Sequence, residues 1–277
     1  MDKVNFTKMH GLGNDFVVIN NIDGSLKLEQ QRIRELSDRY TGIGFDQLLV
    51  IEKASVAVAE FNYRIFNADG GEVEHCGNGA RCFARYVYDK GLTNNRTIEV
   101  NTTGGLITLH LLENQDVTVE VGTPVFEPAD IPFLAPQEQN TYEINVGGTA
   151  LTVGAAAIGN PHVLVQVDNV DTAPVDTLGP LLESHDQFPN RVNVGFMQII
   201  DTENIKLRVF ERGVGETKAC GTGACAAVAI GNKQGLLDKS VSVSLPGGLL
   251  KIEWKDFQSS IEMTGTCSTV FEGQTKM

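Results

Sequence analysis

The pentapeptides CGNGA at residues 76–80 and CGTGA at residues 220–224 are nearly identical and lie 144 positions apart. Self-similarity at a fixed spacing is the sequence signature of a repeated structural unit. Further pairs of matching segments keep the same order at spacings of 143 to 151 positions: Phe66 with Phe210, 98–105 with 241–248, 13–18 with 159–164, and 43–49 with 194–200. We therefore predict a duplicated domain of roughly 130–145 residues.

Each copy combines strand-like segments with one helix-like segment. Short β-branched and aromatic runs separated by turn residues indicate strands, among them FVVIN at 16–20, QLLVIE at 47–52, TIEVNT at 97–102 and VTVEV at 117–121. After each CGxG the pattern changes to helical spacing, over 80–91 and over the alanine-rich stretch 224–235. The second stretch is apolar on nearly all sides, which predicts a helix buried inside its domain.

These patterns predict an α/β (α+β) fold of two pseudo-symmetric halves. We expect each half to be a curled, mostly antiparallel β-sheet or barrel around one central α-helix, with the active site in the cleft between the halves. The proline-rich and polar segment 127–141 is expected near the boundary between them.

Composition excludes several function classes. The chain has 277 residues, a formal net charge of −13 and a pI of about 4.8, which argues against nucleic acid because phosphate backbones need a basic face. No apolar run approaches the roughly 18 residues of a membrane helix, and the N-terminus lacks the apolar segment of a signal peptide. We therefore expect no membrane partner, a cytoplasmic location, and five cysteines that are free thiols.

Cys76 and Cys220 stand at the predicted starts of the two helices. The first amides of a helix lack partners within it and stabilise anions, so we expect a lowered pKa for both thiols and a cradle for a carboxylate. Inverting a stereocentre requires removing a proton from one face and returning one to the other, which a thiolate and a thiol across a cleft can do. The pattern therefore indicates an amino-acid racemase or epimerase with two bases.

The motifs resemble the diaminopimelate epimerase family, which interconverts LL- and meso-diaminopimelate without pyridoxal phosphate. The resemblance spans nearly the whole chain and rests on five segments: KMHGLGNDF at 8–16, RIFNADGGEVEHCGNGARC at 64–82, GNPH at 159–162, RVNVG at 191–195 and ERGVGETKACGTGACA at 211–226. It implies an isomerase of lysine and peptidoglycan precursor synthesis that uses no cofactor and no metal, binds a small-molecule substrate and forms a homodimer. It also implies a first half of residues 1–120 joined by the returning C-terminal strand 266–277, and a second half of residues 121–265.

The resemblance also implies roles for individual residues. Cys76 and Cys220 are implied as the catalytic bases. Backbone amides of four residues are implied to hold the carboxylate at the reacting centre: Gly77, Asn78, Gly221 and Thr222. Polar groups implied near that centre are Asn14, Gln47 and, additionally, His162.

A further set is implied to bind the distal amino-acid end of the substrate: Asn67, Asn160, Asn193, Glu211 and Arg212. Within it, Arg212 suits a bidentate carboxylate contact and Glu211 suits an ammonium. One position departs from the family pattern, since His75 stands where relatives often carry Met or Gln. Its imidazole would lower the pKa of Cys76 if it faced the thiol, whereas an exposed histidine would not.

Other interpretations of these residues remain open. The asparagines 14, 67, 160 and 193 suit turns or caps, and Glu211 with Arg212 suits a solvated pair. GLGND at 11–15 lacks the full nucleotide-binding fingerprint, and Lys218 lacks the motif of a pyridoxal phosphate site. No set of four ligands with zinc spacing occurs, and a structural disulfide between Cys76 and Cys220 is disfavoured in the cytoplasm.

Two alternative functions follow from the same architecture. A proline or hydroxyproline racemase would also use paired cysteines, although the polar distal set argues against a small apolar ring. A noncatalytic amino-acid-binding protein is the alternative from another class, and it would need no thiolate pair. Replacing each cysteine by serine separates them, because a binder would keep its affinity and an epimerase would lose turnover.

Overall fold

The computed structural model describes residues 3–73 and 76–277 and divides into two compact units. Unit 1 holds the described residues up to Glu120 together with Thr264–Met277, and unit 2 is Val121–Met263. His75, considered above as a neighbour of Cys76, lies outside the described residues.

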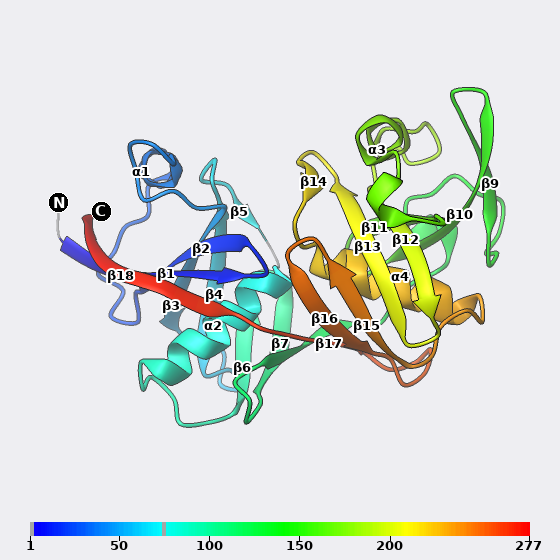
Figure 1. Ribbon diagram of the computed structural model, residues 1–277. Helices are drawn as coiled ribbons and strands as arrows, with labels where there is room; N and C mark the ends of the chain where they lie inside the picture. The colour runs from blue at the N-terminus through cyan, green and yellow to red at the C-terminus, as the bar shows by residue number, and fades with distance from the viewer. Residues whose placement is uncertain (1–2, 74–75) are drawn as a thin grey trace. The chain divides into compact units, whose positions relative to one another are not determined.

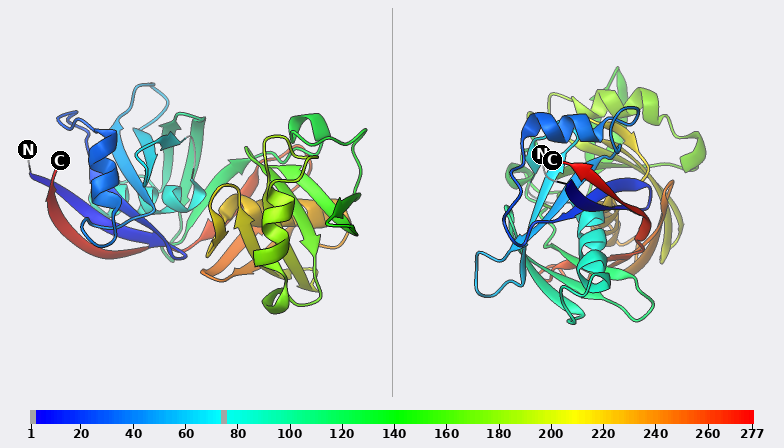
Figure 2. Two further views of the ribbon diagram at one scale, coloured as in Figure 1. Left: turned by 90° about the horizontal axis from the view of Figure 1, so that it is seen from above. Right: turned by 90° about the vertical axis from the view of Figure 1, so that its left-hand side faces the viewer.

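Unit 1 is a curled sheet that packs around one buried helix, α2 (Figures 1 and 2). Its ladders run in the order β18, β1, β2, β3, β4, β6, β7 and β8, with β5 also on β4, and only β2–β3 and β4–β6 are parallel in the described part. Its elements are β1 Lys3–Gly11, β2 Asn14–Asn20, α1 Gln30–Ser37, β3 Gln47–Lys53, β4 Phe61–Asn67, β5 Glu72–Val73, α2 Gly77–Asp89, β6 Thr97–Thr102, β7 Gly105–Leu111, β8 Val117–Gly122 and β18 Ser268–Lys276. Strand β8 also pairs with β17 (Ile261–Gly265), whose last two residues belong to unit 1, but among the described residues no ladder joins β8 to β18, so the sheet is not a closed barrel.

Unit 2 repeats this arrangement around α4. Its ladders run in the order β9, β10, β11, β12, β13, β15 and β16, with β14 also on β13, and β11–β12 and β13–β15 are parallel. Its elements are η1 Pro128–Asp130, β9 Tyr142–Val146, β10 Thr149–Ala157, β11 Pro161–Gln166, η2 Val170–Thr172, α3 Val175–Glu183, β12 Asn193–Asp201, β13 Asn204–Glu211, β14 Gly215–Thr217, α4 Gly221–Lys233, β15 Ser240–Leu245, β16 Gly248–Glu253 and β17 Ile261–Gly265. Strands β9 and β10 of unit 2 thus correspond to β18 and β1 of unit 1.

Equivalent ion pairs confirm the predicted duplication. Arg64 on β4 donates Nε and Nη2 to the two carboxylate oxygens of Glu72, at 2.7 and 2.8 Å. Arg208 on β13 makes the same fork with Glu216, at 2.6 and 2.8 Å. Each pair therefore joins two equivalent strands, β4 with β5 in unit 1 and β13 with β14 in unit 2, at equivalent positions of the register.

The ladders correct one of the predicted segment pairs. Gln47 lies opposite Phe16 in β2–β3, and Asn193 lies opposite His162 in β11–β12. Because Phe16 and His162 are equivalent, the counterpart of Gln47 is Asn193. Matching 43–49 with 194–200 instead pairs Gln47 with Gln198, and this match is wrong. Both segments contain a Gly-Phe dipeptide, which suggests an alignment that the strand pairing does not follow.

The two central helices begin directly after the two cysteines, as predicted. Cys76 is the N-cap of α2 and Cys220 is the N-cap of α4. Helix α4 is buried on nearly every side, which its alanine-rich sequence predicts. Helix α2 also buries a charged residue completely, since the side chain of Arg81 has no exposed area.

Two segments that were noted for their composition lie outside the long strands and helices. The segment 127–141 lies in unit 2, a few residues after the division between the units at Glu120 and Val121, and its Ile131 and Phe133 are part of that unit's buried core. GLGND at 11–15 forms the two-residue turn between β1 and β2, in which Leu12 and Gly13 have φ values of 55° and 85°. Positive φ at both positions is typical of a tight hairpin turn, and this turn sets Asn14 at the start of β2.

We predict that Gly79→Ala destabilises unit 1 by about 2 kcal/mol, the usual cost of overpacking a core. A Cβ at Gly79 would lie 2.4 Å from the Tyr63 hydroxyl oxygen and 3.2 Å from Leu49, and both neighbours are buried. The added substitution Tyr63→Phe should recover part of the loss because it removes the nearer atom. Urea unfolding followed by circular dichroism measures both changes, and the single variant Tyr63→Phe is the control. An unchanged midpoint for Gly79→Ala would contradict the close approach.

Candidate functional site

The first half-site surrounds Cys76 at the N-terminus of α2. The backbone amide of Gly79 donates to the Cys76 sulfur at 3.4 Å, and the side-chain oxygen of Asn14 lies 3.8 Å from the same sulfur. Asn78 donates its side-chain amide to that Asn14 oxygen at 3.3 Å. Cys76 is partly exposed.

Gln47 and Asn67 extend this half-site from the facing ends of β3 and β4. The side-chain nitrogen of Gln47 donates to the side-chain oxygen of Asn67 at 2.9 Å. The side-chain oxygen of Gln47 is buried and has no hydrogen-bond partner within residues 3–73 and 76–277. Because a buried acceptor without a donor is costly, this oxygen suits a ligand that brings an N–H group.

The second half-site surrounds Cys220 at the N-terminus of α4. The Cys220 side chain is buried, and its sulfur lies 3.8 Å from the hydroxyl of Thr222. Burial and the carboxylate of Glu211 raise the pKa of the Cys220 thiol well above its usual value, and the amide of Gly223 offsets this only in part. The lowered pKa that we expected from the helix start alone is therefore wrong for Cys220, because desolvation outweighs the helix amides.

Glu211, Asn193 and Arg212 form a connected group beside Cys220. The hydroxyl of Thr217 donates to the Glu211 carboxylate. Asn193 is buried, accepts the Arg212 backbone amide at 3.0 Å and donates to the carbonyl of Pro161 at 3.0 Å. The Arg212 guanidinium donates one bond to the Asn190 carbonyl at 3.1 Å, which orients it.

His162 and Asn160 occupy the start of β11. The His162 ring nitrogen Nε2 and the Asn160 side-chain oxygen are 2.9 Å apart, so the amide oxygen accepts and Nε2 carries the proton. Burial, together with the charge of Arg212, lowers the pKa of His162 to about 3. The imidazole is therefore neutral at physiological pH and serves as a fixed hydrogen-bonding group.

The structure distributes the predicted site residues between the two units. Unit 1 holds six of them: Asn14, Gln47, Asn67, Cys76, Gly77 and Asn78. Among these, hydrogen bonds join Cys76 and Asn78 to Asn14 and, separately, Gln47 to Asn67. Unit 2 holds the others: Asn160, His162, Asn193, Glu211, Arg212, Cys220, Gly221 and Thr222. The cysteines that we interpreted as structural are buried, as predicted: Cys82, Cys225 and Cys267.

Sequence reasoning missed several residues that support these half-sites. Arg81 donates to the side-chain oxygen of Asn78 at 2.8 Å, and Asp46 accepts from Asn14 at 2.9 Å. In unit 2 the buried Glu183 accepts the amide of Gly213, directly after Arg212, at 2.9 Å. Arg81 and Asp46 lie within segments quoted in the sequence analysis, so their positions could have marked them as candidate site residues. Nothing in the sequence distinguishes Glu183.

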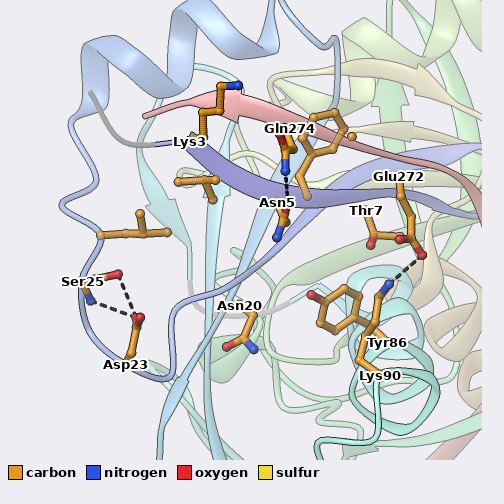
Figure 3. A pocket seen from close by; sticks show the side chains of 14 residues that line it. Lys3, Asn5, Thr7, Asn20, Asp23, Ser25, Tyr86, Lys90, Glu272 and Gln274 are labelled. Atoms are coloured by element: carbon orange, nitrogen blue, oxygen red, sulfur yellow. Dashed lines mark hydrogen bonds and ion pairs between the residues drawn. The ribbon is translucent and has the colours of Figure 1, made fainter.

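A separate hollow of about 720 Å³ lies on unit 1, away from the predicted site residues (Figure 3). Its lining is mostly polar and comes from β1, β18, α2 and the loop after β2. Lys90 and Glu272 form an ion pair across it, and Asn5 and Gln274 share a hydrogen bond of 2.9 Å. None of the predicted catalytic or substrate-binding residues lines this hollow.

No group of three or more His, Cys, Asp or Glu side chains in residues 3–73 and 76–277 is arranged to hold a metal ion. None of the helices in that part of the chain is both long enough and apolar enough to cross a bilayer.

The sequence was also compared with known families. The family described as "Diaminopimelate epimerase" matches residues 6–127 and 154–270, which is most of the chain and includes both cysteine half-sites. The chain belongs to the diaminopimelate epimerase family. Membership places it among isomerases of the epimerase and racemase type, as the motifs predicted.

Solved structures share the family fold at low sequence identity. A phenazine biosynthesis protein of the PhzF family from Bacillus anthracis is 19% identical with a TM-score of 0.71, and each chain is covered completely. A hydroxyproline epimerase from Agrobacterium vitis, with bound trans-4-hydroxy-L-proline, is 14% identical with a TM-score of 0.71, over 98% of this chain and 92% of that one. A protein described as a probable proline racemase from Agrobacterium radiobacter K84, with bound carbonate, is 15% identical with a TM-score of 0.72, over 99% and 93% of the two chains. At these identities the likeness shows the fold alone.

We predict that Glu211→Gln lowers the pKa of Cys220. Removing the negative charge that disfavours the thiolate stabilises the thiolate and so lowers the pKa. The pH titration of the Cys220 Cβ chemical shift by NMR, which needs no reagent to reach the buried sulfur, measures the change. Glu216→Gln is the matched control because it removes a carboxylate that is paired with Arg208. A Cys220 pKa that stays unchanged or rises in Glu211→Gln would refute the role of Glu211.

Proposed function

We propose that this protein interconverts LL- and meso-2,6-diaminopimelate by two-base proton transfer without pyridoxal phosphate. The observation that carries the proposal is the equivalent placement of Cys76 and Cys220, each as the N-cap of a buried helix. The proposal requires both half-sites to act on one α-carbon of one substrate. It also requires two reduced thiols, which fits the cytoplasm as the compartment.

The proposed reaction has two proton transfers. The thiolate of one cysteine removes the α-proton, and the electron pair of that C–H bond passes into the carbanion stabilised by the carboxylate. The thiol of the other cysteine then donates its proton to the opposite face, where the same electron pair forms the new C–H bond. The two cysteines exchange protonation states in one turnover, so each serves as acid for one substrate isomer and as base for the other.

The helix starts supply the proposed carboxylate cradle. Charge develops on the substrate carboxylate as the α-proton leaves, and preorganised amides aimed at it stabilise the transition state more than the ground state. The residues proposed to provide these amides occupy the first turns of the two helices: Gly77, Asn78, Gly221 and Thr222. Asn14 and Gln47 are the polar groups proposed beside the reacting centre.

The distal end of the substrate distinguishes diaminopimelate from smaller amino acids. The residues proposed to bind it are Asn67, Asn160, Asn193, Glu211 and Arg212, with His162 as an additional neutral group. Arg212 carries the positive charge suited to a second carboxylate, and the bond to the Asn190 carbonyl orients its guanidinium. In this proposal Glu211 has a double role, since it suits an ammonium and also raises the pKa of Cys220.

Proton NMR of LL-diaminopimelate in D2O tests the proposal directly. We expect the reduced protein, with no added pyridoxal phosphate, to exchange the α-proton for deuterium and to produce the meso isomer. Cys76→Ala and Cys220→Ala should each abolish inversion, because each leaves one face of the substrate without a proton donor. Cys225→Ala is the matched control. This buried cysteine lies inside α4, further along the helix than Cys220, and its replacement should leave turnover intact.

Failure of that experiment would change the proposed substrate. If the folded, reduced protein exchanges no proton of diaminopimelate, the same measurement with proline and hydroxyproline tests the nearest alternative. If a substrate binds and no substrate exchanges, the protein is a binder and the two-base mechanism is wrong.

We also propose that the protein is a homodimer. Unit 1 exposes Val270 and Phe271 on β18, with 56% and 47% of their surface accessible, and a second copy of the chain could cover this strand. We expect size-exclusion chromatography with light scattering to give twice the 30.0 kDa chain mass. Val270→Lys should shift the particle toward the monomer, with Leu249→Lys, an exposed apolar residue of unit 2, as the control. A monomer at micromolar concentration would refute the dimer.

A further inference from the structure

A chain of hydrogen bonds runs through the Cys76 half-site, from the donor Arg81 at one end to the acceptor Asp46 at the other. Arg81 donates to the side-chain oxygen of Asn78 at 2.8 Å, and Asn78 donates to the side-chain oxygen of Asn14 at 3.3 Å. Asn14 in turn donates its side-chain nitrogen to the Asp46 carboxylate at 2.9 Å. Because a guanidinium only donates and a carboxylate only accepts, the two ends fix which way both amides point.

Asp46 is held firmly at the accepting end. Arg39 donates to its Oδ1 at 2.7 Å and forms an ion pair with it. Its Oδ2 accepts the Asn14 side chain and also the backbone amide of Asp15, at 3.1 Å. Asp15 pairs with Arg39 as well, and with the nearly buried Lys8, which anchors the cluster to β1 and β2. The Asn14 nitrogen therefore has a fixed anionic partner.

This orientation determines what Asn14 presents to Cys76. With its nitrogen on Asp46, Asn14 turns its oxygen toward the sulfur, which lies 3.8 Å away. An amide oxygen accepts a hydrogen bond from a thiol and has no attraction for a thiolate. The Gly79 amide, 3.4 Å from the same sulfur, acts in the opposite sense because it donates to a thiolate. The charge state of Cys76 thus depends on which group Asn14 presents.

We propose that Asp46 is a positioning residue that keeps the Asn14 oxygen facing Cys76 and thereby holds this cysteine toward its neutral, proton-donating form. The proposal concerns the resting protein, and its meaning for catalysis rests on the proposed epimerase function. Without the Asp46 acceptor, the Asn14 nitrogen loses its anionic partner, and the amide can rotate at the cost of the bond from Asn78, so that its N–H group donates to the sulfur. The thiolate of Cys76 then gains a further hydrogen bond.

Other groups near Cys76 are common to all the variants compared. They are Tyr63 on β4, Arg81 and Cys82 on α2, and Lys8, Asp15 and Arg39 in the cluster around Asp46. Glu74 and His75, adjacent in sequence, lie outside the described residues. Comparing variants that differ only at positions 14 and 46 therefore isolates the proposed effect.

The test is a double-mutant cycle read by the pH dependence of Cys76 alkylation with iodoacetamide. Asp46→Ala removes the acceptor and is expected to lower the Cys76 pKa by half a unit to one unit, which raises the alkylation rate at pH 7 by about three- to tenfold. In an Asn14→Ala background the same substitution should change the rate much less, because the amide through which Asp46 acts is gone. Asp46→Asn keeps an oxygen that can accept from Asn14, so it should change the rate less than Asp46→Ala.

Controls separate this effect from loss of structure and from simple charge removal. Peptide mass spectrometry must show Cys82 and Cys225 unmodified, since both are fully buried and react only if the protein unfolds. Glu52→Gln removes another arginine-paired carboxylate of unit 1 and should leave the Cys76 profile unchanged.

Two results would overturn the proposal. An unchanged Cys76 profile in both Asp46 variants would show that Asp46 does not orient Asn14. An equal shift with and without Asn14 would show that Asp46 acts by its charge alone. Because the measurement contains no substrate, a protein that fails to epimerise diaminopimelate can still confirm or refute the role of Asp46.

Discussion

Burial of one helix inside a curled sheet is the constraint on which each unit depends. The first turns of α2 and α4 pack so closely that a Cβ at Gly79 or Gly223 would lie 2.4 Å or 3.1 Å from a neighbouring side-chain atom. Close packing leaves the helix little freedom to shift, because protein interiors are as dense as organic crystals. The capping cysteines are therefore held at fixed points, and catalytic groups benefit from such rigid supports.

The two half-sites share a backbone and differ in their side chains. At equivalent register positions Gln47 corresponds to Asn193, and Asn67 corresponds to Glu211. The Asn14 amide lies beside the partly exposed Cys76, whereas a carboxylate acts on the buried Cys220. Duplication followed by such replacements leaves the two cysteines in unequal surroundings, one partly exposed beside an amide and one buried beside a carboxylate.

Much of the fold followed from local patterns. The repeat, the helices after each cysteine and the strands at 16–20, 47–52, 97–102 and 117–121 are found in the structure, because periodicity and turn residues act over short distances. Matching 43–49 with 194–200 failed because local similarity does not determine register. In the segment 127–141, proline and polar residues indicate a loop and do not reveal that Ile131 is buried.

The sequence by itself determined the family, the duplication and the identity of both capping cysteines, because these depend on the order and spacing of residues along one chain. Tertiary structure alone decided the protonation chemistry around them. The raised pKa of Cys220 depends on burial and on Glu211, nine positions earlier in the chain, and the orientation of Asn14 depends on Asp46 and Arg39. Desolvation and hydrogen-bond direction depend on which groups lie close together in space, so the spacing of residues along the chain does not predict them.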